Sequence, residues 1–177
     1  MRTARYLHQL VVHTLSARAV KGTLQWGAVN IPCAIGRCGR RARKRERDGA
    51  TPAGVWGITG ALYRADRVCR PSTGLPLRRI GRADGWCDAP SDRNYNRAIK
   101  HPYGASAERL WRSDGLYDVI VVLGHNQRPR FRGGGSAIFL HCAHDDFQPT
   151  EGCIAVRRAD LMRMLPRIGR RTKVRIG

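Results

Sequence analysis

The sequence predicts a mainly β protein with small helices, on three observations. Short apolar runs alternate with segments rich in Gly, Pro, Asp and Arg, a pattern typical of strands joined by turns. The run 117–123, YDVIVVL, is apolar on both faces and predicts a central strand. Residues 158–168 place apolar side chains at the spacing of a short amphipathic helix. Because 177 residues suit one domain with its own core, we expect a single domain over 1–177.

The other elements follow from the same patterns. Further strands are predicted at residues 10–15, 19–26, 31–35, 55–63 (a strand or strand pair), 136–142, 154–156 and 173–176. Segment 36–54 is predicted to be a charged loop, and segment 64–107 a long irregular insertion that forms one wall of a cleft. Residues 107–112 predict a short helix. Pro166 should distort the end of the helix at 158–168.

The candidate chemistry lies late in the chain. One apolar run, 137–140, ends in His141, and another, 154–156, begins directly after Gly152 and Cys153. A polar, turn-rich loop separates the two runs, so the ends of neighbouring strands can bring a thiol and an imidazole together. A thiolate is a nucleophile and a histidine can generate it, which is the minimum equipment for nucleophilic acyl transfer.

Each of these residues also has a structural interpretation. A histidine that ends an apolar strand often serves the fold, and a lone cysteine is often simply buried. Gly152 before Cys153 favours the nucleophile, because a residue without Cβ permits a tight turn and close approach of a substrate. Cys142 follows His141 on the same predicted strand and therefore points to the opposite face, so we exclude it as the nucleophile.

A metal site is the first alternative class. Candidate ligands are dense here: His141, Cys142, His144, Asp145 and Cys153. His141 and Cys142 project to opposite faces of a strand, however, and cannot easily share one ion. No CxxC pair occurs among the six cysteines, and their spacing fixes no disulfide pairing. We therefore expect no metal site. His144, Asp145 and Asp146 are predicted to be polar surface residues of a loop, with a place in the cleft as the alternative.

The residues around Cys153 resemble the catalytic region of the L,D-transpeptidases, the YkuD-type domain. That family has a His on one strand and a later Ser-His-Gly-Cys motif; here the His is His141, and residues 150–153 (TEGC) occupy the motif. Further blocks that resemble the family are 44–46, 48–54, 85–88 and 95–97. The last two are similar to a bacterial subgroup that carries PTEGC in place of SHGC. The blocks follow the family's order, and the resemblance covers residues 10–176.

The resemblance implies an L,D-transpeptidase-like β-sandwich with a catalytic cleft and no cofactor. It implies that Cys153 attacks a carbonyl of a peptidoglycan stem tetrapeptide, that His141 activates the thiol, and that an amine acceptor resolves the thioester into a cross-link. A backbone carbonyl would hold the imidazole, and the amides around Gly152 and Cys153 would form an oxyanion hole. An L,D-carboxypeptidase, in which water resolves the thioester, is the alternative enzyme.

The motif departs from the family at three positions. Thr150 replaces the usual Ser, Glu151 the usual His, and Ala155 an Arg often found two residues after the Cys. We assign substrate binding to Thr150, Glu151, Ser136 and Tyr95, with core or turn roles as the alternative for the last two. A Glu151 charge that pointed inward would raise the pKa of the thiol, so we expect it to face the substrate amine or an arginine.

The charge balance raises another class, a noncatalytic polyanion-binding module. The chain has 33 Lys and Arg against 13 Asp and Glu, a net charge of +20, which suits a polyanionic partner. The dominance of arginine over lysine fits equally well with a composition bias of the genome. The densest basic run, 40–47, has no interleaved aromatic residue, and stacking platforms need them. We therefore expect peptidoglycan stem peptides, and no nucleic acid, as partners.

The sequence also bears on location. No apolar stretch approaches the roughly 20 residues of a membrane helix, so no membrane span is expected. Residues 1–20 are basic, but polar residues interrupt their apolar patch and no export signal is visible. The family resemblance nevertheless implies the periplasm or cell envelope. The oligomeric state cannot be predicted from these patterns.

Overall fold

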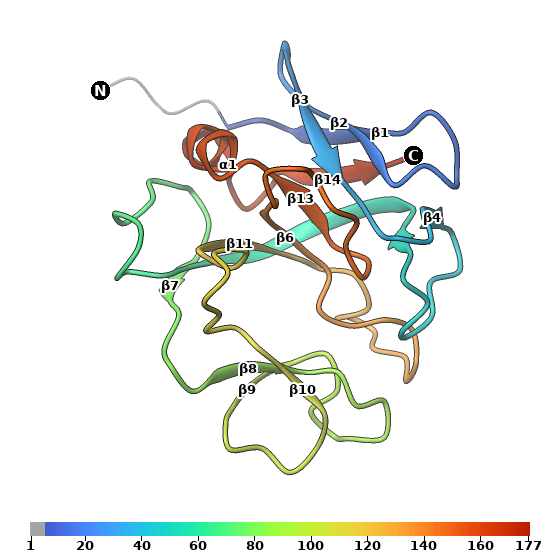
Figure 1. Cartoon of the computed structure of the whole chain (residues 1–177), viewed down its shortest axis with the longest axis vertical. Helices are drawn as coiled ribbons and strands as arrows, with labels where there is room; N and C mark the ends of the chain where they lie inside the picture. Colours follow the sequence, from blue (N-terminus) through green and yellow to red (C-terminus); the bar gives the residue numbers. More distant parts are fainter. Residues whose placement is uncertain (1–5) are drawn as a thin grey trace.

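The computed structural model of the protein describes residues 6–177 and is almost entirely β (Figure 1). Its strands are β1 (Gln9–His13), β2 (Lys21–Trp26), β3 (Val29–Ala34), β4 (Arg40–Arg41), β5 (Thr51–Pro52), β6 (Gly54–Tyr63), β7 (Leu77–Arg79), β8 (Asp84–Cys87), β9 (Ala98–Lys100), β10 (Ala107–Arg109), β11 (Val119–Leu123), β12 (Phe139–Cys142), β13 (Ile154–Val156) and β14 (Lys173–Ile176). One helix, α1 (Arg158–Met164), continues into a 3₁₀ turn, η1 (Leu165–Arg167). The prediction of a mainly β chain with small helices is confirmed.

The main sheet closes on itself. Its strand order is β11-β12-β13-β3-β2-β1-β14-β6-β7, and β6 also pairs with β11. That pairing joins the edges of an eight-stranded barrel, from which β7 extends as a ninth strand. Parallel pairs, β1 with β14 and β12 with β13, occur beside antiparallel ones. The two layers expected of a sandwich are therefore opposite walls of one mixed barrel.

The barrel interior holds the main hydrophobic core. Alternate residues of each strand point into it, for example Leu10 and Val12 of β1 and Val174 of β14. Helix α1 adds its apolar side to the same core through Leu161 and Met164. The helix ends one residue before Leu165, and Pro166 lies in the following 3₁₀ turn, as predicted.

Strands β11, β12 and β13 are buried on both faces. One face contributes to the barrel core. The other face of β11 and β12 packs in a second cluster that includes Ile120, Phe139 and Cys153, whereas Ala155 of β13 packs with Ala34 and Phe147 in a third. This second cluster lies toward a small three-stranded sheet, β10-β8-β9, which Figure 1 shows set apart from the barrel. Trp86 of β8 crosses Phe139 edge to face at 5.3 Å, which joins the small sheet to β12.

The predicted helix at 107–112 is wrong. Residues 107–109 form strand β10, which pairs antiparallel with β8 so that Glu108 lies opposite Trp86. A helix of six residues is marginal by itself, and a nonlocal sheet pairing outweighs its local preference. The insertion predicted as irregular at 64–107 likewise contains β7, β8 and β9.

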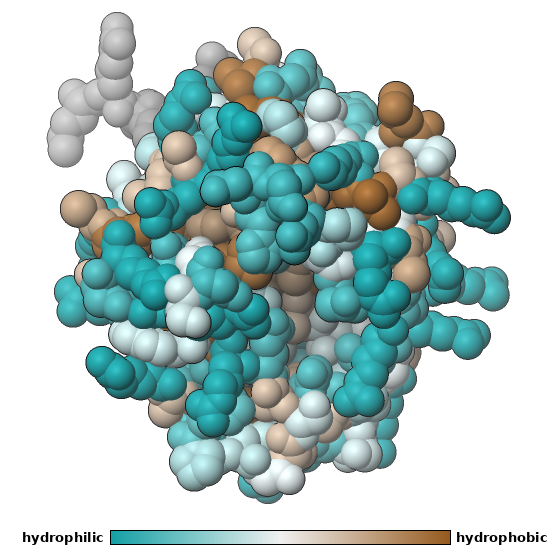
Figure 2. Space-filling model, in the orientation of Figure 1, coloured by the Kyte–Doolittle hydropathy of each residue, from teal (hydrophilic) through white to brown (hydrophobic). Residues whose placement is uncertain are grey.

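Within residues 6–177, no helix combines the length and the apolar character that crossing a membrane would require. Hydrophilic side chains cover most of the face shown in Figure 2.

Candidate active site

A pocket of about 660 Å³ opens between the outer face of β12 and β13, the small sheet and the 36–50 loop. Five of the predicted site residues line it: Ser136, His141, Thr150, Glu151 and Cys153. Gly152 and Tyr95 are not among its lining residues. The predicted insertion at 64–107 contributes Asp88 to the pocket wall, and Glu108 of β10 lines the pocket as well.

Cys153 precedes β13 and is only 9% exposed. Its Sγ donates to Ala137 O at 3.1 Å and accepts from Phe139 N at 3.3 Å. Burial, with a further contribution from the negative charge of Glu108, raises the pKa of the Cys153 thiol to about 12. The resting group is therefore a neutral thiol near neutral pH.

His141 lies on β12 and is 5% exposed. Its Nδ1 is 2.8 Å from Cys142 O, and because a carbonyl only accepts, Nδ1 carries the proton. Nε2 is then left with a lone pair, which is the form a general base needs. Burial lowers the pKa of His141 to about 4, so the ring is neutral. The predicted support of the imidazole by a backbone carbonyl is confirmed in this geometry.

The thiol and the imidazole reach the pocket from adjacent parallel strands. His141 pairs in register with Ala155, two residues after Cys153, and His141 and Cys153 both line the pocket outside the barrel. Within the described chain, Sγ bonds to backbone groups of 137 and 139 and not to the imidazole. The two groups are thus a neutral acid and a neutral base rather than a preformed ion pair.

Cys142 faces the other way, as predicted. Its side chain belongs to the barrel core, and its Sγ lies 3.9 Å from Val119 O. Among residues 6–177, no three His, Cys, Asp or Glu side chains are grouped closely enough to hold a metal ion.

Gly152 and Thr150 shape the turn before the thiol. Gly152 has φ +136°, and a Cβ there would lie 2.8 Å from Ala50 O, so only glycine fits. Thr150 Oγ1 accepts from Gly152 N at 3.1 Å and donates to Cys153 O at 2.6 Å. The Thr150 hydroxyl is therefore engaged within the turn, although the residue lines the pocket.

Glu151 points to an arginine, one of the two orientations expected from the sequence. Arg37 Nε donates to its carboxylate oxygens at 2.9 and 3.0 Å. Both side chains are largely exposed, 53% for Arg37 and 76% for Glu151. The acidic neighbour of Gly152 thus directs its charge to the pocket rim, away from the thiol.

Tyr95 and Asn96 hold the chain that enters β12. Tyr95 is buried, its hydroxyl donates to Glu46, and it accepts from Gly135 N at 3.0 Å. Asn96 Oδ1 accepts from Ala137 N at 3.1 Å. Burial and the Glu46 contact raise the pKa of Tyr95 above its ordinary value. These contacts position the carbonyl of Ala137, which accepts the hydrogen bond from the Cys153 thiol, and the buried Ser136 that lies between Gly135 and Ala137.

Glu108 and Tyr117 are pocket residues that the sequence analysis missed. The Tyr117 hydroxyl donates to the Glu108 carboxyl, and the Tyr117 ring meets His141 edge to face at 5.2 Å. Burial raises the pKa of Glu108 above its ordinary value, and burial and the Glu108 charge raise that of Tyr117. Glu108 was missed because a helix was predicted at 107–112. In the structure it lies on strand β10, and the alternation of side chains along that strand directs Glu108 towards Tyr117 and the pocket.

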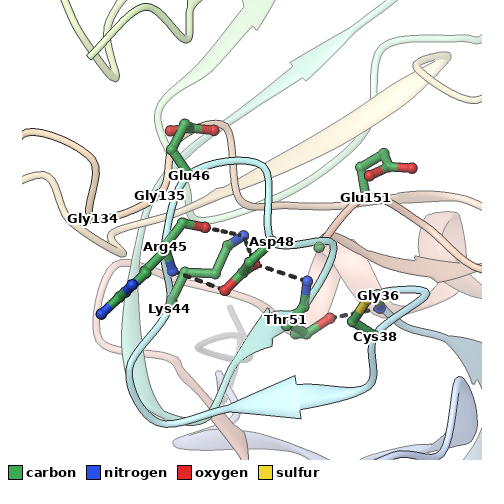
Figure 3. A network of polar contacts seen from close by, with 12 residues as sticks. Gly36, Cys38, Lys44, Arg45, Glu46, Asp48, Thr51, Gly134, Gly135 and Glu151 are labelled. Atoms are coloured by element: carbon green, nitrogen blue, oxygen red, sulfur yellow. Dashed lines mark hydrogen bonds and ion pairs between the residues drawn. The ribbon is translucent and has the colours of Figure 1, made fainter. Parts of the chain in front are cut away.

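Lys44 and Asp48 form a second missed feature (Figure 3). Both side chains are buried, and Lys44 Nζ donates to Asp48 Oδ1 at 2.5 Å and to Arg45 O at 3.0 Å. Asp48 also accepts from the amides of Arg45 and Ala50, at 2.9 Å each. Lys44 lines the pocket, and its positive charge partly offsets the upward shift of the Cys153 pKa.

A buried thiol and a neutral imidazole that line one pocket are the groups that cysteine-dependent acyl transfer uses. The model of the YkuD family, described as the L,D-transpeptidase catalytic domain, matches residues 12–176. The chain therefore belongs to that family. No curated protein and no solved structure shows significant similarity to the chain. The family suggests peptidoglycan peptides as substrates and the cell envelope as location.

Proposed function

We propose that the protein is a peptidoglycan L,D-transpeptidase of the subgroup with PTEGC at the nucleophile, in which Cys153 is the nucleophile and His141 the base. The observation that carries the proposal is the orientation of the imidazole. Its Nδ1–H is held by Cys142 O at 2.8 Å, which leaves Nε2 as the basic nitrogen, and His141 lines the same pocket as Cys153. Membership of the family supports the same assignment.

Acylation follows from the neutral resting groups. The thiol, with its pKa near 12, and the imidazole, with its pKa near 4, favour proton transfer only as the sulfur attacks. As the S–C bond to the substrate carbonyl forms, the proton moves from Sγ to His141 Nε2. The imidazolium then returns that proton to the nitrogen of the leaving amino acid as the peptide C–N bond breaks. A thioester on Cys153 and a neutral imidazole remain.

The backbone amide of Cys153 is the donor that stabilises the oxyanion of the tetrahedral intermediate. The Gly152 amide already donates to Thr150 Oγ1 at 3.1 Å, so Gly152 acts by allowing the turn rather than as a donor. An acceptor amine then attacks the thioester, gives its proton to His141, and leaves as the cross-linked peptide while the thiol recovers a proton. Water in place of the amine gives the L,D-carboxypeptidase reaction.

The charges around the pocket support a substrate that carries both signs. Its lining includes the cations Arg37, Lys44, Arg47 and Arg112, and the acids Glu46, Asp88, Glu108 and Glu151. A stem-peptide diamino acid presents a carboxylate and an amine together. Ser136, Thr150 and Glu151 remain our candidates for substrate contact at this wall, and Tyr95 supports it from behind.

The test is mass spectrometry of the products from purified, reduced protein and tetrapeptide muropeptides. The matched control is Cys153→Ala, since the barrel core does not depend on the thiol. A cross-linked dimer that disappears with Cys153→Ala is the expected result. A tripeptide product alone would replace the transpeptidase with the carboxypeptidase. Unchanged substrate with folded protein would contradict both.

A further inference from the structure

The loop between β11 and β12, residues 125–135, presents an unusual tip. It carries Arg128, Arg130, Phe131 and Arg132 in close succession. Arg128 and Arg132 are exposed, and Phe131 is 66% exposed, which makes it one of the few exposed large apolar side chains of the described residues. The pocket chemistry uses none of these four side chains.

Hydrogen bonds from three side chains, Asn126, Asn96 and His125, fix the conformation of the 125–135 loop. Asn126 brackets Phe131: its Oδ1 accepts from Phe131 N at 2.8 Å, and its Nδ2 donates to Phe131 O at 2.9 Å and to Gly135 O at 2.9 Å. Asn96 Nδ2 donates to Asn126 O at 2.8 Å. His125 Nε2 lies 2.9 Å from Gly134 O. The tip is therefore held in one conformation, which lowers the entropic cost of binding a ligand there.

The charges at the tip are uncompensated. Among residues 6–177, no carboxylate forms an ion pair with Arg97, Arg128, Arg130 or Arg132. Partial burial lowers the pKa of the Arg130 guanidinium, and the positive charges of Arg97 and Arg128, which lie nearby, lower it further. Like charges gathered on a rigid loop repel one another, and an anionic ligand would relieve that repulsion.

A second basic segment borders the loop. Glu46 N donates to Gly133 O at 2.9 Å, which brings Arg45 and Arg47 beside the tip. Among the described residues Glu46 forms no ion pair with either arginine, and its carboxylate accepts from the Tyr95 hydroxyl instead. The basic run at 40–47 lacked an aromatic residue in sequence, and the fold supplies one from a segment about eighty residues away, Phe131.

The exposed phenylalanine decides between polyanions. A solvated polyphosphate would satisfy the arginines but leave the Phe131 ring in water. A single-stranded nucleic acid stacks successive bases on successive aromatic rings, and the tip offers one ring. An anionic lipid interface offers phosphates for the arginines and an apolar boundary for the ring in the same plane.

We propose that the 125–135 loop docks the protein on an anionic phospholipid surface, with Arg128 and Arg132 contacting lipid phosphates and Phe131 entering the interface. Glu46 and Arg47, which adjoin the loop, also line the pocket, so docking would hold the pocket mouth near the membrane plane. This site is independent of the acyl-transfer chemistry and does not rest on Cys153.

Co-sedimentation of the full chain with phosphatidylglycerol-containing vesicles tests the proposal. Arg128→Gln/Arg132→Gln should weaken binding roughly ten- to thirty-fold, since each basic residue near an anionic surface contributes about five-fold. The matched control is Arg170→Gln/Arg171→Gln, two exposed arginines before β14 that give the same loss of charge. That control should bind nearly as the unaltered protein does.

Phe131 is tested separately. Phe131→Ala should weaken vesicle binding about ten-fold, whereas Phe131→Leu, which keeps an apolar side chain, should restore most of it. Equal losses in the two double-arginine variants would overturn the proposal, because net charge alone would then explain binding. Equal binding to phosphatidylcholine vesicles, or tight Phe131-dependent binding of a deoxythymidine oligonucleotide without vesicle binding, would overturn it as well.

Discussion

Two ion pairs border the pocket, Lys44–Asp48 and Arg37–Glu151, and they differ sharply in how far their side chains are exposed to solvent. Lys44 and Asp48 are buried, at 3% and 8% exposure, and share further hydrogen bonds with backbone groups. Arg37 and Glu151 meet at a similar distance but at 53% and 76% exposure. Charges removed from water depend on their partners, while exposed charges keep their hydration. The first pair should therefore hold the 44–50 loop in place, and the second should have little weight in the fold.

The largest effect is expected from Asp48→Asn. It leaves the Lys44 ammonium buried without its counter-ion, which typically costs about 3–5 kcal/mol of the free energy of unfolding. Denaturant unfolding measures the loss. Lys44→Met/Asp48→Asn removes both charges and should recover a large part of it. A double variant no more stable than Asp48→Asn would show that the backbone contacts of Asp48, and not the ion pair, hold the loop.

The same pair gives a pH dependence. Burial alone would raise the pKa of Asp48, but hydrogen bonds from Lys44 and from the amides of Arg45 and Ala50 outweigh burial and lower it. A depressed folded-state pKa stabilises the fold above the unfolded value of about 3.9. This contribution should be lost as the pH falls from there through the lower folded value. In Asp48→Asn this part of the acid dependence should be absent.

Gly152→Ala is expected to have the next largest effect. Gly152 lies between the Lys44–Asp48 pair and Glu151 of the Arg37–Glu151 pair. It follows Glu151 in the chain, and a Cβ on it would lie 3.5 Å from Lys44 Nζ and 2.8 Å from Ala50 O. With φ at +136°, the substitution should cost about 1–3 kcal/mol of stability and displace the Cys153 turn. The control is Gly133→Ala. Gly133 also has a positive φ, +74°, but a Cβ there would meet no atom within 4 Å, so this variant should lose less stability. The difference between the two variants separates the cost of backbone strain from the cost of the steric clash with Ala50 O.

Glu108→Gln tests a second comparison, between the effects of Glu108 and Glu151 on the pKa of the Cys153 thiol. Glu108, 45 residues away in sequence, raises the pKa of Cys153, whereas Glu151, two residues away, is not among the causes of the shift. Loss of the Glu108 charge should lower that pKa and increase iodoacetamide labelling of Cys153 at alkaline pH roughly several-fold. Peptide mapping by mass spectrometry separates this site from the other cysteines. An unchanged rate would mean that Glu108 is already neutral beside Tyr117.

The sequence predicted what depends on local pattern. The strand at 117–123, the helix at 158–168 with its end near Pro166, and the opposite directions of His141 and Cys142 all follow from periodicity and are found in the structure. Glu108 could not be predicted, because its place depends on the pairing of β10 with β8, a nonlocal contact.

The Lys44–Asp48 ion pair could not be predicted for a related reason. Lys44 and Asp48 stand in a run of charges that composition describes as a solvated loop. Only the packing of 44–50 against the 133–135 and 150–153 segments buries them. The closure of the barrel by β6 and β11 is likewise a long-range pairing that strand patterns alone leave open.

The smallest effect is expected from Glu151→Gln. Its carboxylate meets Arg37 in water, where the attraction is screened and the two side chains lose freedom to form the pair. The unfolding midpoint and the pH dependence of Cys153 alkylation should both match those of the unaltered protein. If muropeptide turnover falls in this variant while those two readouts stay fixed, Glu151 contacts substrate. A drop in the midpoint comparable to that of Asp48→Asn would instead contradict the distinction between the two pairs, because exposure would then not determine what an ion pair contributes here.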